Sequence, residues 1–163
     1  MNVSLKTLDK SLKKLLTVYL IVVAIGISIG IAYLGSETDV SKKGIVEQYN
    51  GSTSADEIDI PDKYPKGIKE MFLTTHNHIL GLAPLLLSLG LIIYFSTINR
   101  KLKMFLLYEP LISLIVTFGS IWLVRFIHPD FVYLTILSAI LMYSSIYLSI
   151  GLSIYELNFL RNK

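Results

Sequence analysis

Four long apolar runs constrain the fold of this chain more than any other feature of its sequence. They cover residues 15–34, 71–95, 104–124 and 131–155. A helix of about 20 residues crosses the roughly 30 Å hydrocarbon core of a bilayer. Strands would be shorter and would alternate polar with apolar residues, and a membrane barrel would need at least about eight of them. The runs therefore predict four membrane-spanning helices.

The composition agrees with a membrane protein and excludes several kinds of site. Only 17% of the 163 residues are charged, whereas soluble domains average about a quarter. The chain has no cysteine, which excludes disulfides, thiolate catalysis and cysteine-ligated zinc or iron–sulfur sites. It also lacks the basic, aromatic-interleaved patch of nucleic-acid binders and the nucleophile–base set of a hydrolase. We therefore expect the lipid bilayer, copies of the chain or other membrane subunits as partners, no nucleic acid, and no enzymatic activity of the chain alone.

The lysines and arginines predict how the helices are oriented. Nine of them lie before the first run, between the second and third runs, or after the fourth run, and six lie on the other side. Short loops rich in lysine and arginine stay in the cytoplasm. The first run is too long for the core of a signal peptide, so we interpret it as a retained helix. We expect residues 1–163 to form one all-α domain of the inner (plasma) membrane, a four-helix bundle with both termini cytoplasmic and an external cap at residues 35–70.

Polar residues recur along one face of each of the last two helices. The third run carries Glu109, Ser113, Thr117 and Ser120, and the fourth carries Ser138, Ser145, Ser149 and Glu156. Helical spacing places each set on one stripe. Because polar side chains are costly against lipid, both stripes should face protein, either each other or the second helix. In the first helix, Gly26 and Gly30 predict a face for close helix packing.

The two intramembrane carboxyl groups, Glu109 and Glu156, allow two interpretations. One is functional: a proton path, or a carboxyl group that keeps its proton inside the membrane. The other is structural, with both side chains at the cytoplasmic interface and paired with nearby cations, namely Arg100, Lys101, Lys103 or Arg161. Proline suits the first turn of a helix, so Pro110 predicts that the ordered third helix begins there.

The histidines gather near the external surface in this topology. His76 and His78 begin the second helix, while Arg125 ends the third and His128 follows it. We expect these side chains to lie at one level of the bundle. Residues two apart on a helix point about 200° away from each other, so only one of His76 and His78 can face the bundle. We expect it to be His78, which lies deeper.

Several ligands would suit such a cluster. One b-type haem would take His128 opposite His76 or His78, with Arg125 as a propionate or quinone partner. A zinc or copper site would use the histidines together with the carboxylate of Asp130. Without a metal, a histidine–arginine cluster would bind a quinone or an anionic lipid head. A purely structural alternative is that the histidines hydrogen-bond to the cap.

Two resemblances bear on these alternatives. The segment "TTHNHILGL" resembles helix starts in haem-bearing membrane proteins related to haem–copper oxidase subunits, which implies a haem-binding or redox-linked membrane subunit. The loop "QYNG" and the segment "PKGIKEMFLTTHNH" resemble a group of small four-helix membrane proteins over residues 45–156, which implies the fold but no activity. Two alternative functions therefore stay open. The protein could be a scaffold or accessory subunit of a larger membrane complex, or a small metal-, quinone- or lipid-binding membrane protein.

Overall fold

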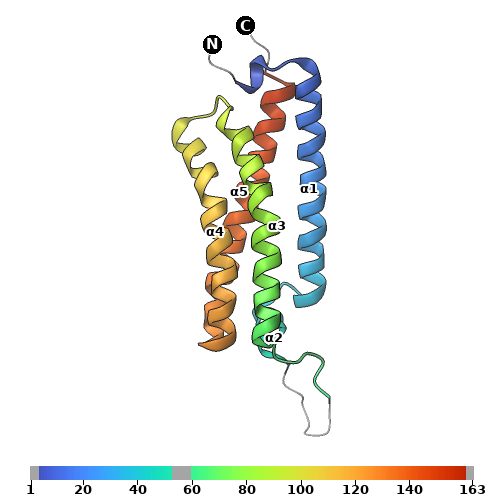
Figure 1. Cartoon of the computed structure of the whole chain (residues 1–163), viewed down its shortest axis with the longest axis vertical. Helices are drawn as coiled ribbons and strands as arrows, with labels where there is room; N and C mark the ends of the chain where they lie inside the picture. Colours follow the sequence, from blue (N-terminus) through green and yellow to red (C-terminus); the bar gives the residue numbers. More distant parts are fainter. Residues whose placement is uncertain (1–3, 53–59, 161–163) are drawn as a thin grey trace.

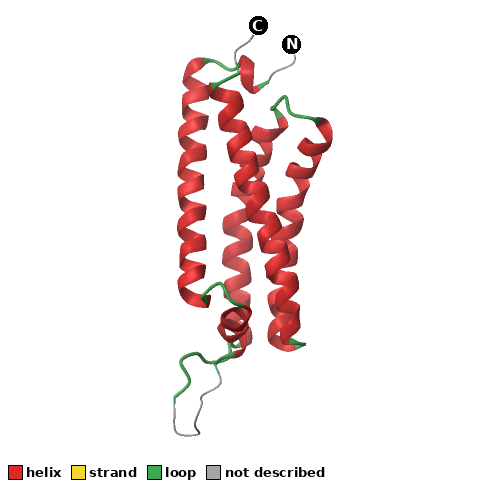
Figure 2. Cartoon of the chain, turned by 180° about the vertical axis from the view of Figure 1, so that it is seen from behind, coloured by secondary structure: helices red, strands yellow, loops and turns green. Residues whose placement is uncertain are grey.

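The computed structural model describes residues 4–52 and 60–160 of the chain, and this part contains helices and loops but no strand (Figure 2). Four of its helices are long and apolar enough to cross a membrane, as the apolar runs predict. The elements in chain order are η1 (Leu5–Thr7), α1 (Lys10–Thr38), α2 (Lys42–Asn50), α3 (Ile68–Tyr94), α4 (Arg100–Phe126), η2 (Pro129–Phe131) and α5 (Val132–Asn158). The protein is therefore an all-α helical membrane bundle.

The long helices α1, α3, α4 and α5 run side by side along the long axis of the molecule (Figure 1). Both ends of the chain lie at one end of the bundle, here called the terminal end, and α2 lies at the opposite end, here called the cap end (Figure 1). The most extensive helix interface joins α4 and α5. Helix α1 is more peripheral, with Val22 61% and Ile29 64% exposed. Such apolar surface suits contact with lipid.

Side-chain caps explain why the helices extend beyond the apolar runs. Asp9 accepts hydrogen bonds from the first backbone N–H groups of α1, and Ser41 caps α2 in the same way. At the start of α4, the side chain of Asn99 accepts from the N–H of Lys101 at 2.8 Å. Such caps pair N–H groups that have no partner inside the helix. The prediction that this helix begins at Pro110 is therefore wrong, because Pro110 lies buried inside α4.

The described residues of the cap lie on the bundle and are tied to it by hydrogen bonds. The side chain of Asn50 donates to the carbonyl of Val124 at 3.2 Å. The guanidinium Nε of Arg125 donates to the carbonyl of Lys66 at 2.8 Å, and the N–H of Lys66 donates to the carbonyl of Tyr49 at 2.9 Å. Both halves of the cap, before and after residues 53–59, are thus fixed to the end of α4.

Tyr49 anchors α2 in the bundle, since its ring packs against the hydrophobic core. Burial raises the pKa of Tyr49 to about 12, and the nearby Tyr143 adds to the effect. The ammonium of Lys66 lies 5.0 Å from the centre of the Tyr49 ring, and burial lowers the pKa of Lys66. The cap therefore places a neutral aromatic ring, rather than charge, in the end of the bundle.

Close approach between α1 and α2 depends on one glycine. A Cβ atom on Gly44 would lie 2.0 Å from the carbonyl oxygen of Thr38, far inside van der Waals contact. By contrast, a Cβ on Gly26 or Gly30 would meet no described atom within 4 Å. The packing face predicted from these two glycines therefore has no partner within the described part of the chain.

Candidate functional site

A line of buried polar side chains follows the interface between α4 and α5, and we call it the α4–α5 seam. Its hydroxyl groups come from both helices: Ser113, Thr117 and Ser120 of α4, and Thr135, Ser138, Ser145, Ser149 and Ser153 of α5. Its carboxyl groups are Glu109 and Glu156. The expectation that the polar stripes face protein is confirmed, because every one of these hydroxyl residues is buried.

Helix association explains the part of the seam near the cap end. The Thr117 hydroxyl donates to Ser138 Oγ at 2.8 Å, and Ser120 Oγ lies 2.7 Å from Thr135 Oγ1. Hydrogen bonds of this kind join membrane helices where the interior offers no water. These four side chains satisfy one another and require no ligand.

Glu109 is not explained in the same way. It lies nine residues beyond the first residue of α4, about 14 Å along the helix axis. Its Oε1 accepts a hydrogen bond from the Ser113 hydroxyl at 2.5 Å. Its Oε2 is shielded from solvent and has no hydrogen-bond partner among the described residues. Pro110 also has no N–H to offer the carbonyl of Leu106 one turn earlier, which leaves a second acceptor without its usual partner close to Glu109.

The pairing of α4 with α5 indicates what lies level with Glu109. Thr117 faces Ser138 and Ser120 faces Thr135. Continued along the two antiparallel helices, this register puts Ser113 level with Met142, and Glu109 level with Ile146, between Ser145 and Ser149. Met142 is apolar and buried, so it interrupts the row of hydroxyl groups on the α5 side of the seam, while Ser113 continues the row on the α4 side. Glu109 thus belongs to the half of the seam that leads to the terminal end.

Glu156, in that same half, has a structural partner. It is 2% exposed, and the backbone N–H of Thr97 donates to both of its carboxyl oxygens, at 2.9 and 2.8 Å. The pairing of Glu156 with Arg100, Lys101 or Lys103, one of the two interpretations of the sequence, is not found among the described residues, and Arg161 lies outside them. Glu156 therefore fixes the turn between α3 and α4 to the end of α5.

Two seam residues were missed by the sequence analysis, Thr135 and Ser153. Both were detectable, because Thr135 precedes Ser138 by three residues and Ser153 precedes Glu156 by three, a spacing that keeps residues on one helix face. Ser153 is fully buried, and its hydroxyl has no hydrogen-bond partner among the described residues. Thr97 carried no signal, since it acts through its backbone.

Of the two histidines in α3, His78 is the one that contacts a neighbouring helix. Its ring stacks on Phe118 of α4, with ring centres 4.7 Å apart. Its Nδ1 lies 2.8 Å from the carbonyl of Thr74, which can only accept, so Nδ1 carries the proton. His76 is exposed. Nearby, the indole N–H of Trp122 donates to the Thr75 hydroxyl at 2.9 Å, so this part of α3 is held mainly by aromatic packing on α4.

The structure does not bring the three histidines to one level. Phe118, against which His78 packs, lies eight residues before the last residue of α4, which corresponds to about 12 Å. His128 lies beyond that helix end. Two axial ligands must both bond one iron atom, so His78 and His128 cannot hold one haem between them. His76 is only about 3 Å closer along the axis, and it points away from His78.

Arg125, Asp130 and His128 have partners in the cap end itself. Arg125 donates to the carbonyl of Lys66, which makes it a tie for the cap. The Asp130 carboxylate accepts from the Lys42 ammonium at 2.7 Å, and this hydrogen bond holds the pKa of Asp130 below its usual value. His128 Nδ1 accepts from the N–H of Asp130 at 3.2 Å. These contacts account for the residues without a ligand.

The metal site predicted from the histidines and Asp130 has no geometric support. Within residues 4–52 and 60–160, no three histidine, aspartate or glutamate side chains gather closely enough to hold a metal ion together. Haem binding itself is not tested by this geometry and stays a prediction. The absorption spectrum of the purified protein tests it, because a bound b-type haem would give a Soret band and split reduced bands.

Comparison with known proteins places the fold in a family. Residues 39–163 match a family described as a transmembrane helical domain, Aq_1264_TM. The chain belongs to this family. The match includes α2, α3, α4 and α5, and therefore both sides of the α4–α5 seam, while α1 precedes it. No curated protein and no solved structure matches the chain. The family supports the expected resemblance to small membrane proteins and identifies a multi-pass membrane protein.

Proposed function

We propose that the protein is a membrane-protein subunit in the cell's plasma membrane. In this proposal Glu109 reversibly binds a proton. The observation that carries the proposal is the buried Oε2 of Glu109, which has no partner among the described residues. The proton would bond to one carboxyl oxygen on binding and would leave toward the terminal end on release.

Glu109 costs free energy inside the membrane and stabilises the bundle little in return. A charged side chain in the middle of a membrane helix costs roughly 2.5–3.5 kcal/mol on insertion scales. Glu156 offsets such a cost by holding the Thr97 backbone, and the hydroxyl pairs of the seam hold α4 to α5. Within the described residues the side chain of Glu109 hydrogen-bonds only to the Ser113 hydroxyl of its own helix, so its hydrogen bonding does not join α4 to another helix. Intramembrane carboxyl groups of this kind commonly mark proton or ion pathways.

Binding fits this seam better than conduction across the membrane. Between Ser138 and Ser145 the α5 side of the seam has Met142, which is buried and offers no hydroxyl group. On the α4 side at that level, the Ser113 hydroxyl donates to Glu109, and no hydrogen bond links it to Thr117 within the described residues. On the terminal side of Met142, the buried Ser145, Ser149 and Ser153 follow one another toward Glu156. A proton would therefore exchange with the terminal end only, and the protein would act as a proton-binding partner of other membrane subunits.

Infrared difference spectroscopy between mildly acidic and mildly alkaline buffers tests this proposal. Protonation of a carboxyl group gives a C=O stretching band that is absent from the carboxylate. We expect a band in the reconstituted wild-type protein that disappears in Glu109→Gln. The matched control is Glu70→Gln, at an exposed glutamate in the first turn of α3, which should keep the band.

Two outcomes would overturn the proposal. The first is a Glu109→Gln spectrum identical to that of the wild type. The second is a steady proton flux through wild-type proteoliposomes under an imposed potential, because conduction would require a path past Met142. Circular dichroism of Glu109→Gln establishes that the variant is folded before its spectrum is compared.

A second candidate function is assembly through α1, and the open face around Gly26 and Gly30 favours it. A chain without cysteine allows a clean test by single-cysteine crosslinking. Gly30→Cys should give a crosslinked dimer in membranes, whereas Ile21→Cys, which lies about 180° away around the helix, should not. Equal crosslinking of both variants would indicate random collisions and would contradict this function.

A further inference from the structure

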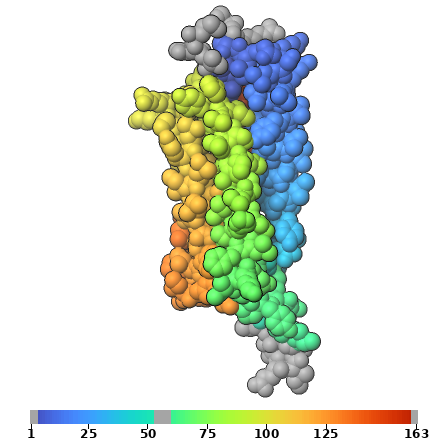
Figure 3. All heavy atoms as spheres, viewed as in Figure 1, coloured from blue at the N-terminus to red at the C-terminus, as the bar shows by residue number. Residues whose placement is uncertain are grey.

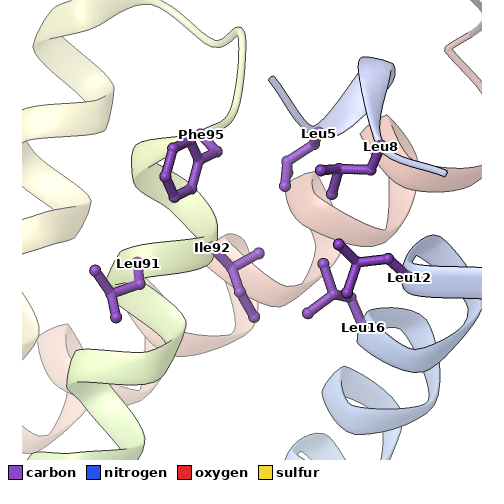
Figure 4. A pocket seen from close by; sticks show the side chains of 7 residues that line it. All are labelled: Leu5, Leu8, Leu12, Leu16, Leu91, Ile92 and Phe95. Carbon is purple, nitrogen blue, oxygen red and sulfur yellow. The ribbon is translucent and has the colours of Figure 1, made fainter. Parts of the chain in front are cut away.

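An apolar groove opens between α1 and α3 at the terminal end, with a volume of about 240 Å³. Four leucines from η1 and the start of α1 form one wall, and residues from the end of α3 form the other. Figure 4 shows these side chains converging from both walls; they are Leu5, Leu8, Leu12, Leu16, Leu91, Ile92 and Phe95. The groove has no polar side chain in its lining, and its size and apolar character suit part of a hydrocarbon chain.

At the terminal end the first described residues, in blue, lie beside the end of α3, in yellow-green (Figure 3). The N–H of Leu5 donates to the carbonyl of Phe95 at 3.0 Å, and the Leu5 side chain is 1% exposed. This hydrogen bond joins the two walls at one point. A ligand group bound at this end of the groove would therefore lie close to the backbone of both η1 and α3.

Two ammonium groups are held in place on either side of that hydrogen bond. The Lys13 ammonium donates to the carbonyl of Lys6, one residue after Leu5, at 2.8 Å. The Lys103 ammonium donates to the carbonyls of Tyr94 and Ser96, the neighbours of Phe95, at 3.0 and 2.5 Å. Each ammonium has three N–H donors, so Lys13 keeps two and Lys103 keeps one for another acceptor.

No acidic side chain neutralises these ammonium groups in the described structure. The terminal end has seven cations in the described chain, namely Lys6, Lys10, Lys13, Lys14, Arg100, Lys101 and Lys103. Its two acids are already used, Asp9 as the cap of α1 and Glu156 as the acceptor for Thr97. The ion pairs found in residues 4–52 and 60–160 all lie at the cap end.

We propose that the terminal end binds one anionic phospholipid, with the lipid phosphate on Lys13 and Lys103 and an acyl chain in the apolar groove. Membrane surfaces supply both halves of this ligand together, and the unpaired positive charge complements the phosphate. A zwitterionic lipid would fill the groove equally well, but it would gain less from the two ammonium groups. This lipid site does not include Glu109, so its test is independent of the proposed proton binding.

Native mass spectrometry of the full chain in mild detergent tests the proposal. The probes are phosphatidylglycerol and phosphatidylcholine with identical acyl chains. We expect the wild-type protein to retain phosphatidylglycerol preferentially. Each lysine near a phosphate contributes about a fivefold change in affinity, so Lys13→Gln should lower the preference about fivefold. Lys14→Gln, at the exposed neighbouring residue of the same helix, is the matched control and should change it little.

A second variant tests the groove itself. Leu12→Trp places a larger side chain at a position that is 37% exposed and lines the groove, so it should reduce retention of both lipids. Equal losses of preference in Lys13→Gln and Lys14→Gln would show diffuse attraction to the whole basic end, and would overturn the proposal. Unchanged lipid retention in Leu12→Trp would overturn it as well. Within the described residues the Lys13 ammonium donates only to the carbonyl of Lys6, so Lys13→Gln should keep the fold.

Discussion

Replacing Glu156 with alanine should destabilise the bundle far more than replacing it with glutamine. In the alanine variant, the N–H of Thr97 loses both of its acceptors, which lie at 2.9 and 2.8 Å in a partly buried position. An unsatisfied buried donor costs about 1–3 kcal/mol. Removal of one buried methylene group adds about 0.8 kcal/mol. The expected total for Glu156→Ala is therefore about 2–4 kcal/mol in the free energy of unfolding.

Glutamine keeps the methylene groups and one oxygen that can accept from Thr97. The expected loss for Glu156→Gln is therefore about 1 kcal/mol. The free energy of unfolding can be measured by titrating mixed micelles with a denaturing detergent. Asp62→Ala, at an exposed position of the cap, serves as the control and should lie within about 0.5 kcal/mol of the wild type.

The difference in stability between Glu156→Ala and Glu156→Gln measures the contribution of the hydrogen bond to Thr97. Equal losses in Glu156→Ala and Glu156→Gln would show that the hydrogen bond to Thr97 contributes nothing. A loss below about 0.5 kcal/mol in Glu156→Ala would show that the turn between α3 and α4 is held by other contacts. Either result would return Glu156 to the list of candidate proton-binding groups.

Three further predictions concern the cap and the topology. Gly44→Ala should cost about 1–3 kcal/mol of stability, because its Cβ would lie 2.0 Å from the backbone of α1, whereas Gly35→Ala meets its nearest atom at 3.5 Å and should be tolerated in thermal unfolding. Because burial raises the pKa of Tyr49 from 10.0 to about 12, its stabilisation of the cap is complete below pH 10 and is lost as the pH rises toward 12, by about 3 kcal/mol. Tyr49→Phe should remove this alkaline loss in hydrogen-exchange measurements. A reporter fused after Lys163 should report cytoplasm and one inserted near Ser54 should report the outside; reporters in the same compartment would contradict the orientation predicted from charge.

Much of the architecture was predictable from the sequence because membrane helices follow simple rules. Apolar runs of sufficient length placed all four long helices, and the helical period placed Ser138, Ser145 and Ser149 on one buried face. Both inferences depend only on local geometry and on the cost of exposing polar groups to lipid. The exact helix starts were harder to predict, since caps such as Asn99 lie outside the apolar runs.

The candidate site was less predictable because a few residues along a helix already change the level in the membrane by many ångströms. Grouping His78 with His128 ignored a rise of 1.5 Å per residue, which separates their levels by about 12 Å or more. The function of Glu156 was hidden for a different reason. Its partner is a backbone N–H in a loop, and any residue but proline would supply that group. Glu109 stands out only once the partners of its neighbours are known.

The ties of the cap have a consequence for the order of assembly during synthesis. Asn50 and Lys66 hydrogen-bond to Val124 and Arg125, which the ribosome makes almost 60 residues after Lys66. The cap therefore reaches its final position only after α4 has entered the bilayer, so it cannot guide the insertion of α3. A nascent chain released before Val124 should carry an open cap that proteases added on the cap side of the membrane cut, and the complete chain should resist them. Resistance of the cap to proteases therefore shows that α4, the third membrane-spanning helix, is in place.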